Sequence, residues 1–159
     1  MKKLFLSLIV FVFATGAAMC QHSLPKGGMQ IDAGIGISNY TTPIYVGFDY
    51  AVHKDMTVGA ELTYRDRSDY WRVIGITGNW NYHFNSAFRI PNNWDVYAGF
   101  KAGFMYYSNY AGYTSNSSTL YLAAQVGGRW FFTNTLGVNL ELGLGNAFTD
   151  GRLGLTIKL

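Results

Sequence analysis

The side chains best suited to acid–base chemistry in this sequence are three histidines, His22, His53 and His83. A histidine held between a hydroxyl and a carboxylate can activate a nucleophile. None of the three has a serine and a carboxylate in an evident strand-by-strand arrangement. His–Cys spacing typical of metal ligands is absent, and the Gly-x-Gly pairs lie within alternating segments rather than at a phosphate-binding turn. The sequence therefore predicts no catalytic residue, no metal site, no cofactor and no enzymatic activity.

Ten charged residues share one side of a two-residue alternation that runs through most of the chain. They are Asp32, Asp49, Glu61, Arg65, Asp95, Lys101, Arg129, Glu141, Arg152 and Lys158. Five are acidic and five are basic. Ionised groups persist in a low-dielectric interior only when they are paired or hydrated. Equal numbers of opposite sign therefore predict an interior network of salt bridges and hydrogen bonds that acts as a plug.

Two tyrosines, Tyr110 and Tyr113, stand among serine, asparagine and threonine in the polar segment 108–118. Tyrosine beside small polar residues suits adaptable recognition of a sugar or a protein. The alternative is a solvated loop whose tyrosines rest on the rim of the fold. We predict that any binding of an external protein or glycan uses this segment.

The elements that must position these residues are eight segments in which apolar and polar residues alternate. They cover residues 29–38, 44–52, 56–65, 72–84, 94–107, 119–131, 136–145 and 151–159. Alternation with period two is the pattern of a half-buried strand, and such lengths suit a tilted crossing of a bilayer. The predicted fold class is therefore all-β: a single domain forming an eight-stranded antiparallel up-and-down transmembrane β-barrel.

The composition of the two faces predicts which one points inward. The polar face carries many glycines beside its charges, which suits the crowded interior of a narrow barrel. The apolar face carries Ile, Val, Leu, Phe and Trp, and would meet lipid. Aromatic residues gather toward both ends of the segments, as in the girdles of membrane barrels. The alternatives are a soluble barrel of the lipocalin kind, with the two faces exchanged, and a soluble β-sandwich.

The start of the chain has the three parts of a secretory signal: Lys2 and Lys3, a short apolar run, and small residues at 16–18. We expect residues 1–20 to be removed and residues 21–159 to form the barrel, although cleavage after Ala18 also fits. Cys20 is the only cysteine, so no disulfide is expected; its alternative interpretation is the acylated first residue of a lipoprotein. Without Lys2 and Lys3, ten basic residues face nine acidic ones, and no basic patch indicates nucleic acid.

Residues 127–134 (GGRWFFTN) and 136–143 (LGVNLELG) resemble the small outer-membrane β-barrel family, which includes OmpA-type and OmpX-type barrels and many porin-like proteins. The ending GLTIKL looks like the terminal strand that such proteins present to the outer-membrane assembly machinery. The resemblance covers residues 29–159. It implies a Gram-negative outer-membrane location, with membrane lipid and that machinery as partners. We also expect a monomer.

The family is functionally mixed, so the resemblance does not name an activity. The function predicted from the residues is that of an integral outer-membrane barrel with a plugged polar interior and a structural or surface-interaction role. Two alternatives remain. One is a narrow channel for a small solute or an apolar ligand, and the other is a lipid-modifying enzyme of the outer membrane.

Overall fold

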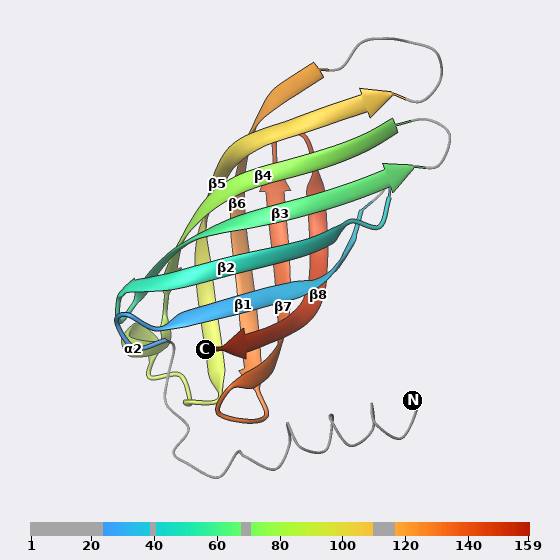
Figure 1. The fold of residues 1–159 in the computed structure, drawn as a ribbon. Helices are drawn as coiled ribbons and strands as arrows, with labels where there is room; N and C mark the ends of the chain where they lie inside the picture. The colour runs from blue at the N-terminus through green and yellow to red at the C-terminus, as the bar shows by residue number, and fades with distance from the viewer. Residues whose placement is uncertain (1–23, 39–40, 68–70, 110–116) are drawn as a thin grey trace, which may run out of the picture.

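The computed structural model describes residues 24–38, 41–67, 71–109 and 117–159. These residues form a closed barrel of eight strands in which each strand pairs with its neighbours in sequence and β1 closes on β8 (Figure 1). Every pairing is antiparallel. The strands are β1 Met29–Ile37, β2 Ile44–His53, β3 Met56–Arg67, β4 Trp71–His83, β5 Trp94–Asn109, β6 Ser117–Phe131, β7 Leu136–Gly145 and β8 Thr149–Lys158. The predicted fold class is confirmed.

The alternation in the sequence becomes an outer and an inner face. Leu140, Leu142 and Leu144 of β7 lie on the outside with more than half of each side chain exposed. Asn139, between them in sequence, is buried inside. The same pattern runs round the barrel, because successive side chains of a strand point to opposite faces. An apolar outer wall around a charged interior fits a lipid environment and excludes the soluble alternative with exchanged faces.

Aromatic side chains line the outer wall near both ends of the strands. Tyr50 and Trp80 share one row of paired residues across β2, β3 and β4. Tyr64 and Tyr106 share another row across β3, β4 and β5, nearer the opposite ends of these strands. This is the two-girdle arrangement of transmembrane barrels, in which aromatic rings occupy the headgroup region.

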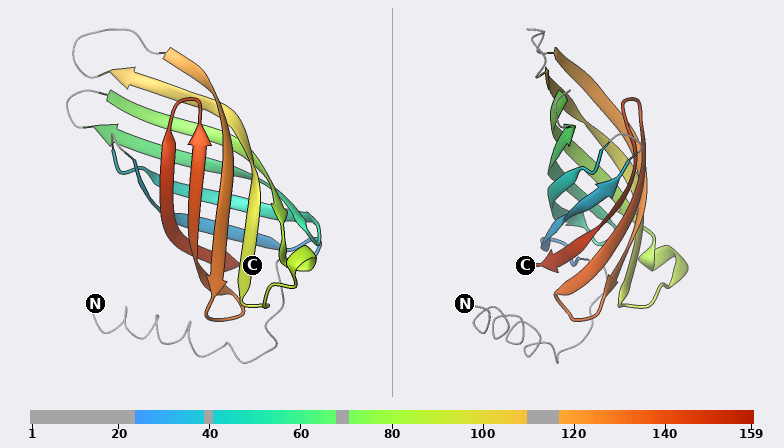
Figure 2. Two further views of the ribbon diagram at one scale, coloured as in Figure 1. Left: turned by 180° about the vertical axis from the view of Figure 1, so that it is seen from behind. Right: turned by 90° about the vertical axis from the view of Figure 1, so that its right-hand side faces the viewer.

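One end of the barrel carries the β2–β3, β4–β5 and β6–β7 connections, together with residues Leu24 and Leu159; we call it the turn end. The other end is the loop end. The strands β3, β4, β5 and β6 have 12, 13, 16 and 15 residues, whereas the remaining four have 9 or 10. The barrel is therefore taller on the β3–β6 side, and the ends of these strands reach farthest at the loop end (Figure 2).

The structure differs from the sequence-based boundaries at several strand ends. At the loop end, β3 and β5 continue to Arg67 and Asn109, and β6 begins at Ser117. A short helix, α2 Asn85–Phe88, stands in the turn-end connection between β4 and β5, which the sequence indicated only as a loop. The strand β8 begins at Thr149 rather than at residue 151, so Asp150 continues the inward face of the strand. Among the described residues, no helix is long and apolar enough to cross a membrane.

Glycines on the inner face make room for large inward side chains of the neighbouring strand. Gly127 of β6 pairs with Tyr97 of β5, and a methyl group at Gly127 would overlap the tyrosine ring. A methyl group at Gly145 would lie 2.7 Å from a ring carbon of Tyr121. Small residues are therefore needed at these two positions by packing.

Replacing Gly127 with alanine is expected to lower the free energy of unfolding by about 1–3 kcal/mol, because the added methyl group must displace the Tyr97 ring in a filled interior. Gly128 provides the matched control, since a methyl group there would lie 3.8 Å from its nearest neighbour, the carbonyl oxygen of Asp95. Urea unfolding of both variants in lipid vesicles measures the difference. Equal losses at the two positions would contradict the packing explanation.

Candidate functional site

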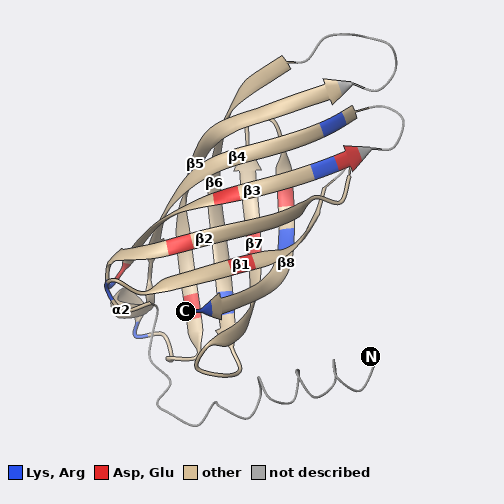
Figure 3. Ribbon diagram, in the orientation of Figure 1, with Lys and Arg blue, Asp and Glu red and all other residues tan. Residues whose placement is uncertain are grey.

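Charged residues of both signs occur on strands all around the barrel (Figure 3), and many of them are buried inside it. The structure arranges them in three groups. We call these the turn-end cluster around Arg129, the central cluster around Lys101, and the loop-end cluster around Arg65. Closure of the barrel brings these residues together, because several partners come from strands that are not neighbours in the sheet.

The turn-end cluster surrounds the guanidinium of Arg129 on β6, whose side chain is 2% exposed. One of its terminal nitrogens lies 2.8 Å from Asp32 of β1 and 3.0 Å from Asp49 of β2. The other lies 3.1 Å from Asp95 of β5. The Tyr97 ring covers the guanidinium, with its centre 4.2 Å from Cζ. One buried cation therefore ties together three carboxylates from three different strands.

Neutral side chains complete the hydrogen bonding of these carboxylates. Asn139 donates to Asp32 over 3.2 Å, while Gln30 and Asn79 donate to Asp49 over 3.0 and 2.7 Å. A buried ion pair offsets its desolvation only when the remaining lone pairs are satisfied in this way. The turn-end cluster is thus an integrated polar network in which each carboxylate has several donors.

The central cluster joins four strands through two cations and two carboxylates. The Lys101 ammonium of β5 donates to Glu61 of β3 over 2.6 Å and to Glu141 of β7 over 2.7 Å. Arg152 of β8 donates to the other oxygen of Glu61 over 2.5 Å. Because Glu61 is shared by Lys101 and Arg152, opposite walls of the barrel are connected across the middle of the interior.

The loop-end cluster combines an ion pair with an apolar cover. Arg65 of β3 makes a two-pronged contact with Asp150 of β8, and one of the two hydrogen bonds is 3.1 Å long. Arg152 reaches the same carboxylate at 3.4 Å and so links this cluster to the central one. The Phe148 ring, from the β7–β8 connection, covers Arg65 with its centre 4.1 Å from Cζ.

Phe148 also belongs to a buried apolar group inside the loop end of the barrel. Its other members are Val73, Met105, Tyr121 and Ala123, with Trp71, Tyr107 and Ala147 packed against them. This apolar group therefore lies inside the loop end of the barrel, on the side formed by β4, β5 and β6.

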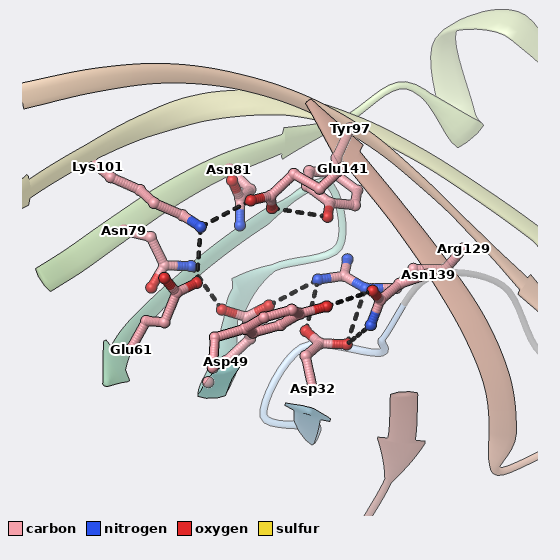
Figure 4. A pocket seen from close by; sticks show the side chains of 12 residues that line it. Asp32, Asp49, Glu61, Asn79, Asn81, Tyr97, Lys101, Arg129, Asn139 and Glu141 are labelled. Atoms are coloured by element: carbon pink, nitrogen blue, oxygen red, sulfur yellow. Dashed lines mark hydrogen bonds and ion pairs between the residues drawn. The ribbon is translucent and has the colours of Figure 1, made fainter. Parts of the chain in front are cut away.

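The space left between the turn-end and central clusters is small. It is a cavity of about 20 Å³, lined by Asp32, Asp49, Glu61, Lys101, Arg129 and Glu141 among others (Figure 4). That volume accommodates about one water molecule. The charged and amide groups around it point toward one another (Figure 4).

A hydroxyl, an imidazole and a carboxylate stand in line at the turn end. His83 Nε2 lies 3.1 Å from Thr57 Oγ1, and His83 Nδ1 lies 2.7 Å from Asp95 Oδ1. This order matches that of a catalytic triad. All three residues are no more than 2% exposed. The alternation did not predict this contact, although Thr57, His83 and Asp95 are inward residues near the turn-end limits of three consecutive strands.

The predicted inward residues occupy the following places. Ion pairs join Asp32, Asp49, Glu61, Arg65, Asp95, Lys101, Arg129, Glu141 and Arg152. Lys158 lies at the turn end, with its ammonium 3.7 Å from the centre of the Phe131 ring. Tyr110 and Tyr113 lie outside the described residues, as do residues 1–20.

Asp150 is the inward charge that the sequence analysis missed, because it was assigned to a loop. With it, the three clusters contain six carboxylates and four basic side chains: Asp32, Asp49, Glu61, Asp95, Glu141 and Asp150 against Arg65, Lys101, Arg129 and Arg152. The balance expected from the sequence thus becomes an acidic excess within these clusters. No group of three or more His, Cys, Asp or Glu side chains suited to a metal ion occurs among the described residues.

Comparison with solved structures finds the same barrel in outer-membrane proteins. The N-terminal β-barrel domain of Pseudomonas aeruginosa OprF matches with a TM-score of 0.67 and 10% identity, over 84% of this chain and 98% of that one. OprG from the same organism matches with a TM-score of 0.65 and 10% identity, over 89% and 99%. Neisserial surface protein A matches with a TM-score of 0.62 and 12% identity, over 83% and 95%.

No model of a protein family and no curated protein matches the sequence. Identities this low show a common fold and nothing finer. A de novo designed transmembrane barrel also matches, with a TM-score of 0.61 and 18% identity, over 87% of this chain and 100% of that one. The chain therefore has the fold of the small outer-membrane β-barrels, as the resemblance in its sequence indicated.

Proposed function

We propose that the protein is an outer-membrane barrel with a plugged interior, whose role is structural or lies in interactions at its outer surface. The observation that carries this proposal is the ion-pair network across the interior. Arg65, Asp150, Arg152, Glu61, Lys101 and Glu141 form one connected series from the loop end to the middle. Arg129 and its three carboxylates occupy the turn-end half.

The space inside the barrel supports a plug over a channel. An eight-stranded barrel is barely wider than its own side chains, and the cavity between the clusters accommodates about one water molecule. A permeating ion would have to displace Lys101 from two carboxylates, each less than 3 Å from its nitrogen. A permeating apolar molecule would have to pass the same charges without compensating them, which is costly in a low-dielectric interior.

Among the described residues, one hydroxyl, imidazole and carboxylate stand in line, and all three are buried. Their burial supports a role without catalysis. Thr57, His83 and Asp95 have almost no exposed surface, so a lipid or soluble substrate does not reach the hydroxyl. Asp95 also forms an ion pair with Arg129, which gives the series a place in the structural network. We assign these residues to packing and hydrogen bonding.

The loop end is the surface left for interactions outside the membrane once the other surfaces are assigned. The apolar outer wall contacts lipid, and side chains occupy the interior. The taller β3–β6 side ends next to the segment that contains Tyr110 and Tyr113, for which we propose recognition of an external protein or glycan. In this orientation the turn end faces the periplasm, and the protein acts as a monomer whose insertion uses the outer-membrane assembly machinery.

Electrical recording across planar lipid bilayers tests the plugged interior. The refolded wild-type chain is expected to give no steady current at moderate voltage. The double variant Glu61→Ala, Lys101→Ala removes one acid and one base from the central cluster, leaving Arg152 beside Glu141 at 3.6 Å. It is expected to give small, brief currents, because two long side chains no longer fill the middle of the barrel. Large steady currents from the wild type would contradict the plug and favour a channel.

A further inference from the structure

The helix α2 carries the most exposed aromatic side chain among the described residues. Phe88 is 72% exposed, compared with 64% for Phe100 and 62% for Phe104 on the outer wall. Exposure of a phenylalanine ring to water is unfavourable, and an exposed apolar side chain indicates a partner where it is continuous with a larger apolar surface. Arg89 follows it with a left-handed backbone (φ 51°), which ends the helix and is uncommon for a residue other than glycine.

The α2 segment is fixed to the barrel on several sides. Ser86 donates a short hydrogen bond to Asp55 in the β2–β3 turn, and the backbone of Phe84 donates to Val96 over 2.8 Å. The buried side chain of Asn85 donates to the carbonyl of Trp94 over 2.5 Å and accepts from the Val96 amide over 3.2 Å. The exposure of Phe88 is thus held in place by the fold and does not result from fraying of a loop.

Phe88 continues the aromatic surface of the outer wall. Its ring stacks on Phe84 with 5.8 Å between centres, and Phe84 meets Tyr82 edge-on at 5.2 Å. Tyr82 follows Trp80 on the lipid-facing side of β4. Figure 2 shows that α2 projects sideways from the wall instead of closing the barrel opening beneath it. The aromatic girdle therefore extends from the strands onto the helix without a break.

The exposed charges near this helix have a single sign. Lys26, Lys54 and Arg89 are the exposed charged side chains that the structure describes at the turn end, and all three are basic. The acidic neighbour Asp55 is buried against Ser86. Basic residues near an anionic membrane surface are attracted to it. Aromatic rings beside basic side chains match the acyl-chain and phosphate layers of a phospholipid leaflet.

We propose that α2 is a membrane foot: the Phe88 ring inserts at the acyl-chain boundary of the leaflet at the turn end, and Arg89 binds lipid phosphate. The partner is anionic phospholipid. The foot lies under the tallest side of the barrel, at the connection between the 13-residue β4 and the 16-residue β5. Fixing the turn end at the headgroup layer sets the depth of the barrel, so that the extra length of β5 and β6 stands beyond the opposite leaflet.

Nitroxide labels measure the depth of the foot directly. Cys20 is the only cysteine, so a chain with Cys20→Ser can carry single labels at Phe88→Cys, at Ser117→Cys at the loop end of β6 as the aqueous reference, and at Leu140→Cys as the lipid reference. The labelled proteins are refolded into phosphatidylethanolamine–phosphatidylglycerol vesicles, and barrel formation is checked by gel mobility. The label at 88 should prefer collisions with oxygen over a water-soluble nickel chelate, at a depth of about 5–10 Å below the phosphates.

A second measurement uses no label. Phe88→Trp adds one indole to the four of the wild type, and the added emission should be quenched by lipids brominated near the headgroup. The proposal is overturned if the label at 88 is as accessible to the nickel chelate as the label at 117. It is also overturned if protection of position 88 appears only after soluble envelope proteins are added, since the partner would then be a protein. Neither outcome depends on whether the interior is plugged.

Discussion

Replacing Arg129 with methionine is expected to destabilise the barrel by about 3–5 kcal/mol, the loss that follows when one member of a buried ionic network is removed. Methionine retains much of the side-chain volume but leaves Asp32, Asp49 and Asp95 without their shared cation. Three neighbouring carboxylates would then repel one another in an interior with little water. This is the largest effect that the charged clusters predict for a single residue.

Two control variants separate charge from geometry. Arg129→Lys keeps the charge but lacks the fork that contacts carboxylates through separate nitrogens, so an intermediate loss is expected. Lys54→Met removes an exposed charge at the turn end and should change stability little. Urea unfolding in lipid vesicles, followed by tryptophan fluorescence, compares the three. A loss for Arg129→Met no greater than that for Lys54→Met would show that the network does not stabilise the barrel.

Placing arginine at Leu140 is expected to cost about 2–4 kcal/mol, because the position lies on the lipid-facing side in the middle of β7. The guanidinium would be drawn into hydrocarbon or forced to reach the headgroup layer. The loss should grow as the hydrocarbon thickness of the vesicles is increased, since the headgroups then lie farther away.

Leu159 is the matched control for Leu140. It is 70% exposed but follows the last strand at the turn end, where an arginine is expected to cost only about 0–1 kcal/mol. The free energies of unfolding of both variants are measured in the same vesicles. Equal costs at the two positions, or a cost that does not depend on bilayer thickness, would argue against the placement of β7 across the membrane.

The sequence predicted most of the fold because period-two alternation determines both the strand and its faces. Leu140 and Asn139 illustrate this: their neighbouring positions alone assign one to lipid and the other to the interior. The same reasoning placed Glu61, Lys101 and Arg129 inside. Which charge meets which depends on the stagger between strands, and the alternation within one strand does not contain that information.

The structural features that the sequence did not predict lie where the two-residue alternation stops. Phe148 lies in the β7–β8 connection and Asp150 follows it, in a stretch that the alternation left outside the strands, yet both side chains are buried. The position of α2 also depends on contacts from other connections, such as that between Ser86 and Asp55. Thr57, His83 and Asp95 come together only once three strands are aligned at their turn ends. Nothing in the local composition of these segments encodes such contacts.

Nuclear Overhauser effects between detergent chains and protein methyl groups test the central claim most directly, in the unmodified protein refolded in micelles. The outward methyl groups of Leu142, Leu144 and Leu155 are exposed on the wall, whereas those of Val73 and Met105 are buried inside the barrel. The arrangement described here predicts strong contacts between detergent chains and the three leucines, and none to Val73 or Met105. Detergent contacts at Val73 and Met105 with none at the leucines would contradict it, because the apolar face would then point inward.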